Sequence, residues 1–307
     1  MLKPRRVNSP IKWFGGKYYL ARKIVELIPE HVSWTEGYGA SLAVTLLKAQ
    51  HGCERIIEAN NRLTNFWKVL ADEKLFKQFK RRVEATPFSN ESFASAAFEL
   101  RKPPTSKQPD VVRAVNFFVT ARMSRQGLME DYATATKNRL RRGMNENVSA
   151  WLSSVEGLEQ VHNRIKTVEI ICGDVLRWLP KFDTPTNVYY GDPPYMHSTR
   201  TGNDEYKEFE VSDRHHAIHL EILTDRAKPL LSRSGFEKLS GDEPYDQYVK
   251  ASERPYEGKF ILSGYNTSLY TTFMKKRGFN RIDIQVSNSA SSKKSKEKKT
   301  ECLWTNF

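Results

Sequence analysis

Short apolar segments alternate with longer segments of helical spacing over roughly the first 70 residues of the chain. Residues 33–38 and 54–57 have the length and composition of strands, and each precedes a segment in which apolar side chains recur with a helical period. Such an alternation is typical of a parallel sheet with crossover helices, which is the fold class that this part predicts. The expected helices are residues 17–28, 43–49 and 63–70.

The alternation stops near residue 72. Residues 74–161 are polar and favour helices, which prolines such as Pro103-Pro104 interrupt, and no alternating strand pattern is visible there. We expect an inserted helical lobe over residues 72–161. The two flanking parts, residues 1–71 and 162–307, then form one α/β domain.

Strand-length segments return after this lobe, so the sheet resumes. The charged stretch of residues 287–300 lies between the last two of these segments, and it fits either a solvated hairpin loop or a phosphate contact. The expected strands are residues 168–172, 187–190, 260–263, 281–286 and 301–305, with helices over 215–228 and 268–276.

Composition narrows the class of protein. The chain has 307 residues, and its 39% hydrophobic content excludes a wholly disordered chain. Its 49 Lys and Arg against 36 Asp and Glu leave a formal charge of +13, which favours a polyphosphate partner such as nucleic acid. Net charge alone also fits an ordinary basic protein.

Cysteine usage and hydropathy bear on the compartment. The three cysteines, Cys53, Cys172 and Cys302, are scattered, so they form neither a disulfide framework nor a four-thiolate zinc site. No apolar run has the length of a membrane span, and the basic N-terminus has no apolar segment behind it. We expect a soluble cytoplasmic protein; a monomer is favoured, although no feature of the sequence fixes the oligomeric state.

The sharpest chemical signal is the motif Asp192-Pro193-Pro194-Tyr195, directly after an expected strand. Two consecutive prolines fix φ near −65° and end a strand ladder, so the carboxylate, the carbonyls and the ring are held in a rigid turn. Open α/β sheets bind ligands at this edge. A plain strand-ending turn with an Asp cap is the alternative interpretation.

With this motif, the chain resembles the DNA adenine-N6 methyltransferases of bacteria and phages, the Dam-like D12 class. The resemblance covers nearly the whole chain, and its elements follow the family's order, with the recognition domain inserted between the two halves. The matching segments are residues 10–17 (PIKWFGGK), 36–39 (EGYG), 58–60 (EAN), 65–66 (NF), 141–152 (RRGMNENVSAWL), 173–174 (GD), 192–195 (DPPY) and 301–306 (ECLWTN).

The resemblance implies a doubly wound, mostly parallel seven-stranded sheet of the class I S-adenosylmethionine-dependent methyltransferases, with one antiparallel strand near its edge. It also implies methyl transfer to adenine N6 in duplex DNA. The Asp192 carboxylate and the Pro193 carbonyl can accept hydrogen bonds from both N–H groups of the amine, which raises the nucleophilicity of its nitrogen. Pro194 completes the turn, and Tyr195 is placed to stack on a flipped base.

S-adenosyl-L-methionine is the implied cofactor. Glu58 follows Gly39 by 19 residues, the relation by which a carboxylate reaches a ribose in dinucleotide folds. In family terms the methionine portion lies by Trp13 and Lys17. The other candidate cofactor residues are Glu36 and Gly39 at the first strand end, where a glycine lets the backbone approach the cofactor closely, Asp174 for the adenine amino group, and Asp192.

Target recognition is expected in the lobe, where Arg and Asn side chains are interleaved. These residue types make bidentate contacts with guanine and adenine, and Arg also neutralises phosphates. A solvated basic face is the alternative for any one of them. The candidates are Arg122, Arg125, Arg139, Arg141, Arg142 and Asn145, and outside the lobe Arg200.

Some residues depart from the family pattern. Gly37 replaces the usual Pro, Glu58 replaces the usual Asp, and Ala40 and Ser41 replace the usual glycines. At Ala40 and Ser41 we expect backbone strain of about 1 kcal/mol or more, and therefore weaker cofactor binding.

The histidines invite a metal interpretation, because His215 and His219 are four residues apart on an expected helix, with His197 and His216 close by. We expect no metal, because no glutamate follows the first of these histidines as it does in a zincin motif. Two rival functions stay open: a noncatalytic DNA-binding relative, and an RNA adenine-N6 methyltransferase. The sequence indicates neither the DNA target nor the biological role, such as restriction-modification, host protection or phage evasion.

Overall fold

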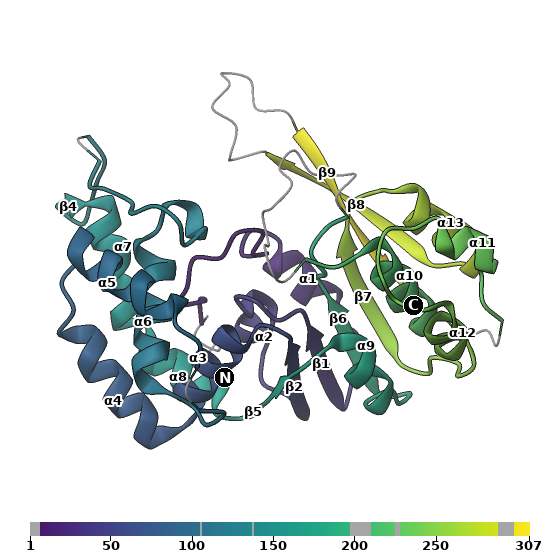
Figure 1. The fold of residues 1–307 in the computed structure, drawn as a ribbon, viewed down its shortest axis with the longest axis horizontal. Coiled ribbons are helices and arrows are strands. Elements are labelled where there is room, and N and C mark those ends of the chain that lie inside the picture. The colour runs from purple at the N-terminus through teal and green to yellow at the C-terminus, as the bar shows by residue number, and fades with distance from the viewer. Residues whose placement is uncertain (1–6, 105, 137, 197–209, 225–227, 288–297) are drawn as a thin grey trace. The chain divides into compact units, whose positions relative to one another are not determined.

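A computed structural model describes residues 7–104, 106–136, 138–196, 210–224, 228–287 and 298–307 (Figure 1). By the density of its internal contacts the chain divides into two units. The first unit comprises residues 1–27 and 39–172, and the second comprises residues 28–38 and 173–307.

The strands form a seven-stranded sheet in the order β5-β2-β1-β6-β7-β9-β8. Strands β1 and β6, β2 and β5, and β6 and β7 pair in parallel, whereas β9 is antiparallel to both β7 and β8. The predicted doubly wound sheet, with one antiparallel strand near its edge, is therefore confirmed. The strands are β1 (Ser33–Gly37), β2 (Cys53–Glu58), β5 (Val168–Cys172), β6 (Asn187–Gly191), β7 (Lys259–Gly264), β8 (Asn280–Ser287) and β9 (Lys298–Thr305).

The first unit holds β2, β5 and a set of helices around one apolar core. Phe66 and Trp67 on α3 contribute to this core, together with Phe118 and Trp151 from the expected lobe. Asp72 ends α3, and its side chain accepts from Leu75 N–H to begin α4. The helices are α1 (Ala21–Leu27), α2 (Ala43–Leu47), α3 (Asn61–Ala71), α4 (Glu73–Glu84), α5 (Asn90–Arg101), α6 (Val111–Met123), the 3₁₀ helix η1 (Arg125–Gly127), α7 (Glu146–Glu156) and α8 (Leu158–Ile165).

The lobe also contains a small hairpin, for which the sequence showed no alternating pattern. It joins β3 (Leu140–Arg141) to β4 (Met144–Asn145) in antiparallel pairing. The two loop residues, Arg142 and Gly143, have φ of 57° and 74°, as a type I′ turn requires. Strands of two residues are too short to show an alternating pattern.

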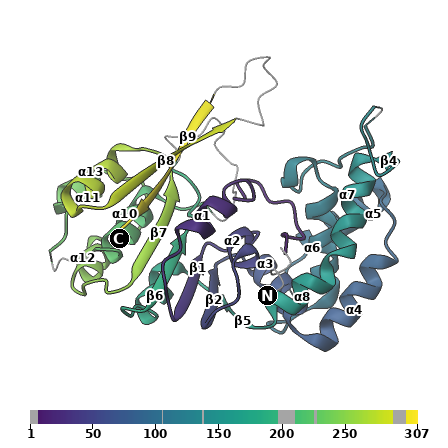
Figure 2. The same cartoon turned by 180° about the vertical axis from the view of Figure 1, so that it is seen from behind.

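In the second unit, α10 (Asp213–Ile222) packs against α12 (Tyr245–Ser252) and α13 (Ser268–Arg277), and Figure 2 shows these helices from behind. The sequence pattern gave no sign of α12 or of the short helix α11 (Arg233–Glu237). The remaining short helices are α9 (Val175–Trp178) and η2 (Leu179–Lys181). Helices α10 and α13 both supply side chains near the carboxyl ends of the strands.

Candidate active site

The order of the strands reverses between β1 and β6. From β1 the chain continues through β2 to β5 at one edge, and it restarts beside β1 with β6 and proceeds toward the other edge. Gly37 and Gly191 are opposite each other at the ends of this parallel pair, and Glu36 is opposite Tyr190. A reversal of this kind is where open α/β sheets bind ligands. The turn that begins at Asp192 therefore follows the strand end best placed to bind one.

Tyr189 explains why both strands end in glycine. A Cβ atom added to Gly37 or to Gly191 would lie 2.6 Å from the Tyr189 hydroxyl oxygen. Gly37 therefore suits this protein, although the family resemblance leads one to expect Pro there. The same hydroxyl lies 2.9 Å from His219 Nε2, so the tyrosine is fixed at both its ring and its tip.

Three histidines of α10 hydrogen-bond to tyrosine hydroxyls near these strand ends. His215 Nε2 lies 2.9 Å from the Tyr38 hydroxyl, His219 Nε2 2.9 Å from that of Tyr189, and His216 Nδ1 2.9 Å from that of Tyr270. Burial lowers the pKa of His215 and, much further, that of His219.

These rings therefore serve as hydrogen-bond partners of tyrosines. Within the described ranges no group of three or more His, Cys, Asp or Glu is arranged to hold a metal ion. His197 lies outside those ranges.

The catalytic candidates form a supported turn. The Pro194 carbonyl oxygen lies 3.0 Å from His216 Nε2. The Tyr195 hydroxyl donates to Glu301 Oε2 at 3.3 Å, and the Tyr195 ring meets the Tyr265 ring edge to face at 4.5 Å between centroids. The sequence motif predicted a rigid turn, and the structure adds the side chains that hold it.

The charge of Asp192 acts on two neighbouring hydroxyls. Burial raises the pKa of Tyr190 well above its usual value, and the Asp192 carboxylate raises it further. The same two causes raise the pKa of Tyr270. The Tyr190 hydroxyl is also 3.0 Å from Ser263 Oγ. Both tyrosines thus stay protonated, so they can donate hydrogen bonds beside the carboxylate.

In the first unit, Glu58 ends β2 with its carboxylate bound to the backbone. Its Oε2 accepts from Ala40 N–H and its Oε1 from Asn60 N–H, each at 2.8 Å. Burial raises the pKa of Glu58, and these hydrogen bonds oppose the rise. A third backbone hydrogen bond, from Ala59, also lowers the pKa, and the carboxylate then keeps about one lone pair for a further donor.

The loop after β1 is strained, as expected, but the strained residues are Tyr38, Ala40 and Leu42 rather than Ala40 and Ser41. Ala40 has a φ of 42° and Leu42 one of 52°, in the left-handed region that favours glycine. The predicted strain at Ala40 is confirmed. The prediction for Ser41 was wrong, because the φ of Ser41 is not positive. The Trp67 indole N–H donates to the Ala40 carbonyl at 3.1 Å and holds the strained residue in place.

The N-terminal candidates fold onto the first unit. Lys17 is only 5% exposed, and its Nζ donates to the Gly15 carbonyl at 3.0 Å. The half-buried Trp13 ring lies 6.1 Å from that of Phe117 on α6. Lys17 is therefore buried, and its ammonium group lies by the glycine loop.

Asp174 lies in the second unit. Its exposed side chain begins α9 by accepting from Leu176 N–H at 2.9 Å. A carboxylate oxygen that caps a helix retains a lone pair for another donor.

The recognition candidates in the lobe differ in burial. Arg122 donates to the Ala150 carbonyl, and burial, aided by the charge of Arg141, lowers its pKa to about 10. Asn145 begins α7 by accepting from Asn147 N–H. Both residues thus support the lobe from within. Arg200 lies outside the described residues.

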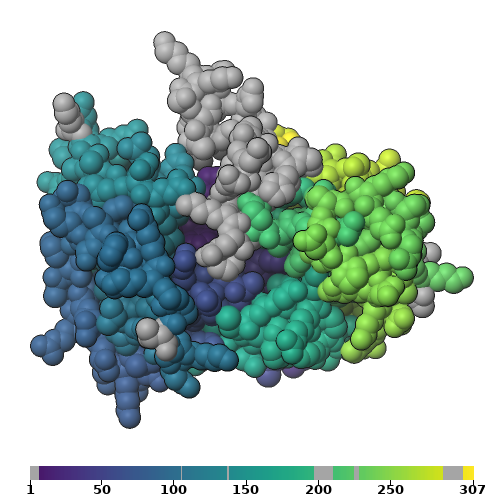
Figure 3. Space-filling view, in the orientation of Figure 1, coloured from purple at the N-terminus to yellow at the C-terminus, as the bar shows by residue number. Residues whose placement is uncertain are grey.

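The exposed arginines also divide into two kinds. Arg142 forms an ion pair with Glu156 and donates to Ser153 Oγ, each at 3.0 Å, and Arg139 lies 3.4 Å from Glu146. Arg125 and Arg141 are exposed, and neither side chain forms an ion pair with a described residue. The hairpin that carries Arg141 stands at the surface (Figure 3), where neighbouring Leu140 is 76% exposed.

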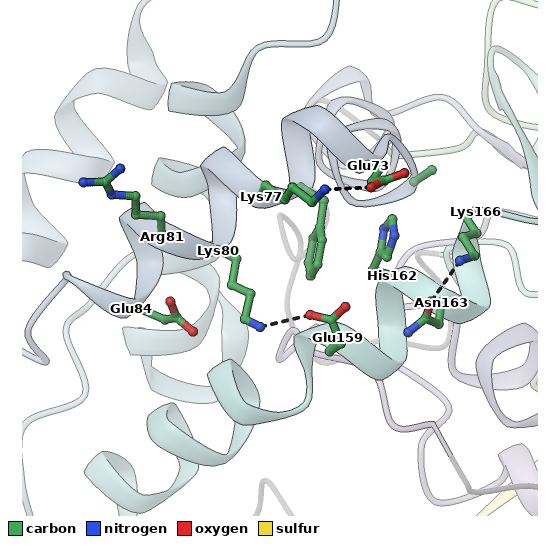
Figure 4. A pocket seen from close by; sticks show the side chains of 11 residues that line it. Glu73, Lys77, Lys80, Arg81, Glu84, Glu159, His162, Asn163 and Lys166 are labelled. Carbon is green, nitrogen blue, oxygen red and sulfur yellow. Dashed lines mark hydrogen bonds and ion pairs between the residues drawn. The ribbon is translucent and has the colours of Figure 1, made fainter.

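A cavity of about 610 Å³ lies between α4 and α8 of the first unit (Figure 4). Two ion pairs line it: Lys77 with Glu73 within α4 at 2.7 Å, and Lys80 on α4 with Glu159 on α8 at 2.9 Å. None of the candidate catalytic or cofactor residues lines it.

The strand order, with its single antiparallel strand, is that of a class I methyltransferase fold, and the DPPY turn lies where that order reverses. The family model described as D12 class N6 adenine-specific DNA methyltransferase matches residues 13–239. The chain belongs to this family. It is an adenine-specific DNA methyltransferase, and its reaction requires a methyl donor.

Two further comparisons complete the picture. No curated protein matches the chain. A solved structure from Pyrococcus horikoshii, described as that of a "putative RNA methyltransferase", is 11% identical and covers 70% of this chain and 97% of its own, with a TM-score of 0.23. No described helix is long and apolar enough to cross a membrane.

Proposed function

We propose that the protein transfers a methyl group from S-adenosyl-L-methionine to N6 of an adenine flipped out of duplex DNA. The observation that carries the proposal is the supported turn from Asp192 to Tyr195 at the end of β6. In this family the group that receives the methyl is the N6 amine of adenine. The turn presents oxygen atoms that can accept hydrogen bonds from such an amine.

The adenine amine is a weak nucleophile, because its lone pair is delocalised into the ring. We assign to the Asp192 carboxylate and the Pro193 carbonyl the role of accepting its two N–H bonds, which concentrates the lone pair on nitrogen. Tyr195 stacks on the extruded base, since a base inside a duplex cannot present N6 to a methyl donor. Removal of such preorganised acceptors typically costs about 10²–10³-fold in rate.

The chemistry of the available donors and acceptors suits S-adenosyl-L-methionine, which supplies an electrophilic methyl group on a sulfonium. Glu58 has a lone pair left for a ribose hydroxyl, and Asp174 has one for the adenine amino group. Lys17 offers a positive charge to the carboxylate of the methionine portion of S-adenosyl-L-methionine. Trp13, Glu36 and Gly39 complete the proposed cofactor residues.

DNA recognition is assigned to the lobe of residues 72–161, with residues 1–71 and 162–307 as the catalytic domain. Arg125 and Arg141 contact DNA directly, because their exposed charges have no described carboxylate partner. Arg139 and Arg142 stiffen the hairpin through their ion pairs. The protein would act in the cytoplasm of a bacterial or phage-infected cell, on double-stranded DNA.

The test is a radiolabelled methyl-transfer assay on adenine-containing duplexes, with the native protein and the Asp192→Ala variant. Label in N6-methyladenine with the native protein and none with the variant supports the proposal. No label with either protein would favour a noncatalytic DNA-binding role. The same assay on RNA decides the remaining rival, because preferential labelling of RNA would contradict a DNA substrate.

A further inference from the structure

We propose that His216 is a positioning residue that, together with Tyr270, sets the orientation of the peptide between Pro194 and Tyr195. The inference rests on the proposed function, since it assigns to a buried pair the task of aiming the turn. His216 is 1% exposed and lies on α10, whereas Tyr270 lies on α13. Two helices thus act on one short turn.

The backbone freedom of the turn shows why this contact matters. The proline rings fix φ of Pro193 and Pro194. Asp192 and Pro193 each precede a proline, which confines their ψ to extended values. The ψ angle of Pro194 is limited by neither rule, and it determines both where the Pro194 carbonyl points and where Tyr195 leaves the turn. The hydrogen bond from His216 Nε2 to that carbonyl, at 3.0 Å, fixes this angle.

The bond also determines the tautomer of the ring. A carbonyl oxygen only accepts, so His216 Nε2 must carry the hydrogen. In the neutral ring Nδ1 then accepts, and the donor is the Tyr270 hydroxyl at 2.9 Å. Burial, and to a smaller extent the charge of Asp192, raises the pKa of Tyr270, which keeps that hydroxyl protonated. Tyr270 therefore holds the histidine in the tautomer that the turn requires.

Tyr195 shows the consequence of the fixed ψ angle. Its hydroxyl donates to Glu301 Oε2 at 3.3 Å and its ring packs on Tyr265, so the ring is held at its far end as well. Rotation about ψ of Pro194 would move the ring away from both partners. The adenine, stacked on that ring, would then be misplaced relative to Asp192.

The experiment compares His216→Leu, which cannot donate to the carbonyl, with His216→Gln, whose amide N–H can. We expect kcat to fall about 10–100-fold in the Leu variant, since a misplacement of about 1 Å can cost that much. The KM for S-adenosylmethionine should stay within about 2-fold, and Gln should recover most of the rate. Tyr270→Phe should lower kcat less, by about 3–10-fold, because the histidine keeps its donor.

His162→Leu is the matched control. His162 is also buried and also bonded to a carbonyl, that of Leu70 at 2.7 Å, but it lies on α8 in the first unit. Its kcat should stay within about 2-fold of native. A native kcat for His216→Leu, or equal losses for its Leu and Gln variants, would overturn the inference while Asp192→Ala still reports on the proposed function.

A second measurement needs no activity. Nitrogen NMR of histidine-labelled protein should show the His216 ring protonated at Nε2, with the signal assigned by its loss in His216→Gln. A neutral ring protonated at Nδ1 would overturn the geometry whatever the fate of the methyl-transfer assay. If the native protein transfers no methyl group but the expected tautomer is present, the proposed function fails and the positioning geometry stands.

Discussion

The turn after β6 and the hairpin of the lobe are both short polar segments, yet they are held in opposite ways. At the turn, His216 and Tyr195 use buried or half-buried hydrogen bonds that fix single atoms. At the hairpin, Arg139 and Arg142 use exposed ion pairs. Exposed pairs contribute little to stability because water competes for them, whereas a buried group that loses its partner is costly. Substitutions should therefore act on rate at the turn and on DNA affinity at the hairpin.

The largest effect should come from Asp192→Asn. The amide keeps the size of the side chain but replaces one acceptor oxygen with a donor, which opposes an amine that must donate. We expect kcat to fall by about 10²–10³-fold with little change in DNA affinity. Single-turnover methyl transfer, combined with DNA binding by anisotropy, measures both. An Asn variant with more than about a tenth of native kcat would contradict the acceptor role.

The next effect is on stability. In Gly37→Ala the new Cβ would lie 2.6 Å from the Tyr189 hydroxyl oxygen, so the ring or the strand must shift. We expect the free energy of unfolding to fall by about 1–3 kcal/mol, as for other overpacked sites. Urea unfolding measures it. Gly157→Ala is the control, because its Cβ would meet nothing nearer than 3.4 Å; equal losses in the two variants would refute the packing argument.

A smaller effect separates two neighbouring arginines. Arg141→Ala should weaken DNA binding several-fold and reduce the slope of log affinity against log salt by roughly 1, as expected for a lost phosphate contact. Arg142→Ala should change the slope less, because Glu156 already pairs with that charge. Binding titrations over a range of salt concentrations measure both. A larger slope change for Arg142 would reverse the assignment.

The smallest effect concerns the strained loop. Ala40→Gly should raise the free energy of unfolding by about 0.5–1 kcal/mol, because glycine adopts the positive φ of 42° without the strain that alanine has. Ser41→Gly should bring no gain, since Ser41 lies outside the left-handed region in the described chain. Thermal or urea unfolding of the pair measures the difference. A gain in the Ser41 variant alone would contradict the assignment of strain.

Local patterns were sufficient for most strands of the sheet. Residues 168–172 were expected as a strand and are β5, because short apolar runs between turns have few other uses. The hairpin at 140–145 was missed because strands of two residues show no alternation. Helix α12 was missed because only Tyr248 and Ser252 of its residues are buried, which is too few to mark a helical period. The DPPY motif gave the rigid turn in the same local way, because proline acts through its own ring.

The roles of the histidines could not be read in this way. The spacing of His215 and His219 invited a metal interpretation, whereas both rings form hydrogen bonds with tyrosines far away in the chain. Glu301 stood in a matching segment without a role until its contact with Tyr195 was visible. A hydrogen bond between distant segments leaves no period or spacing in the sequence.

The sequence by itself determined the fold class, the family resemblance and the chemistry of the turn, because periodicity, proline geometry and residue type are properties of neighbours along the chain. Only the tertiary structure decided which arginines are paired, why Gly37 is tolerated and which side chain holds Pro194. Those depend on which atoms meet after folding. Packing and burial bring residues 22 or more positions apart to within hydrogen-bonding distance, as His216 and Pro194 are.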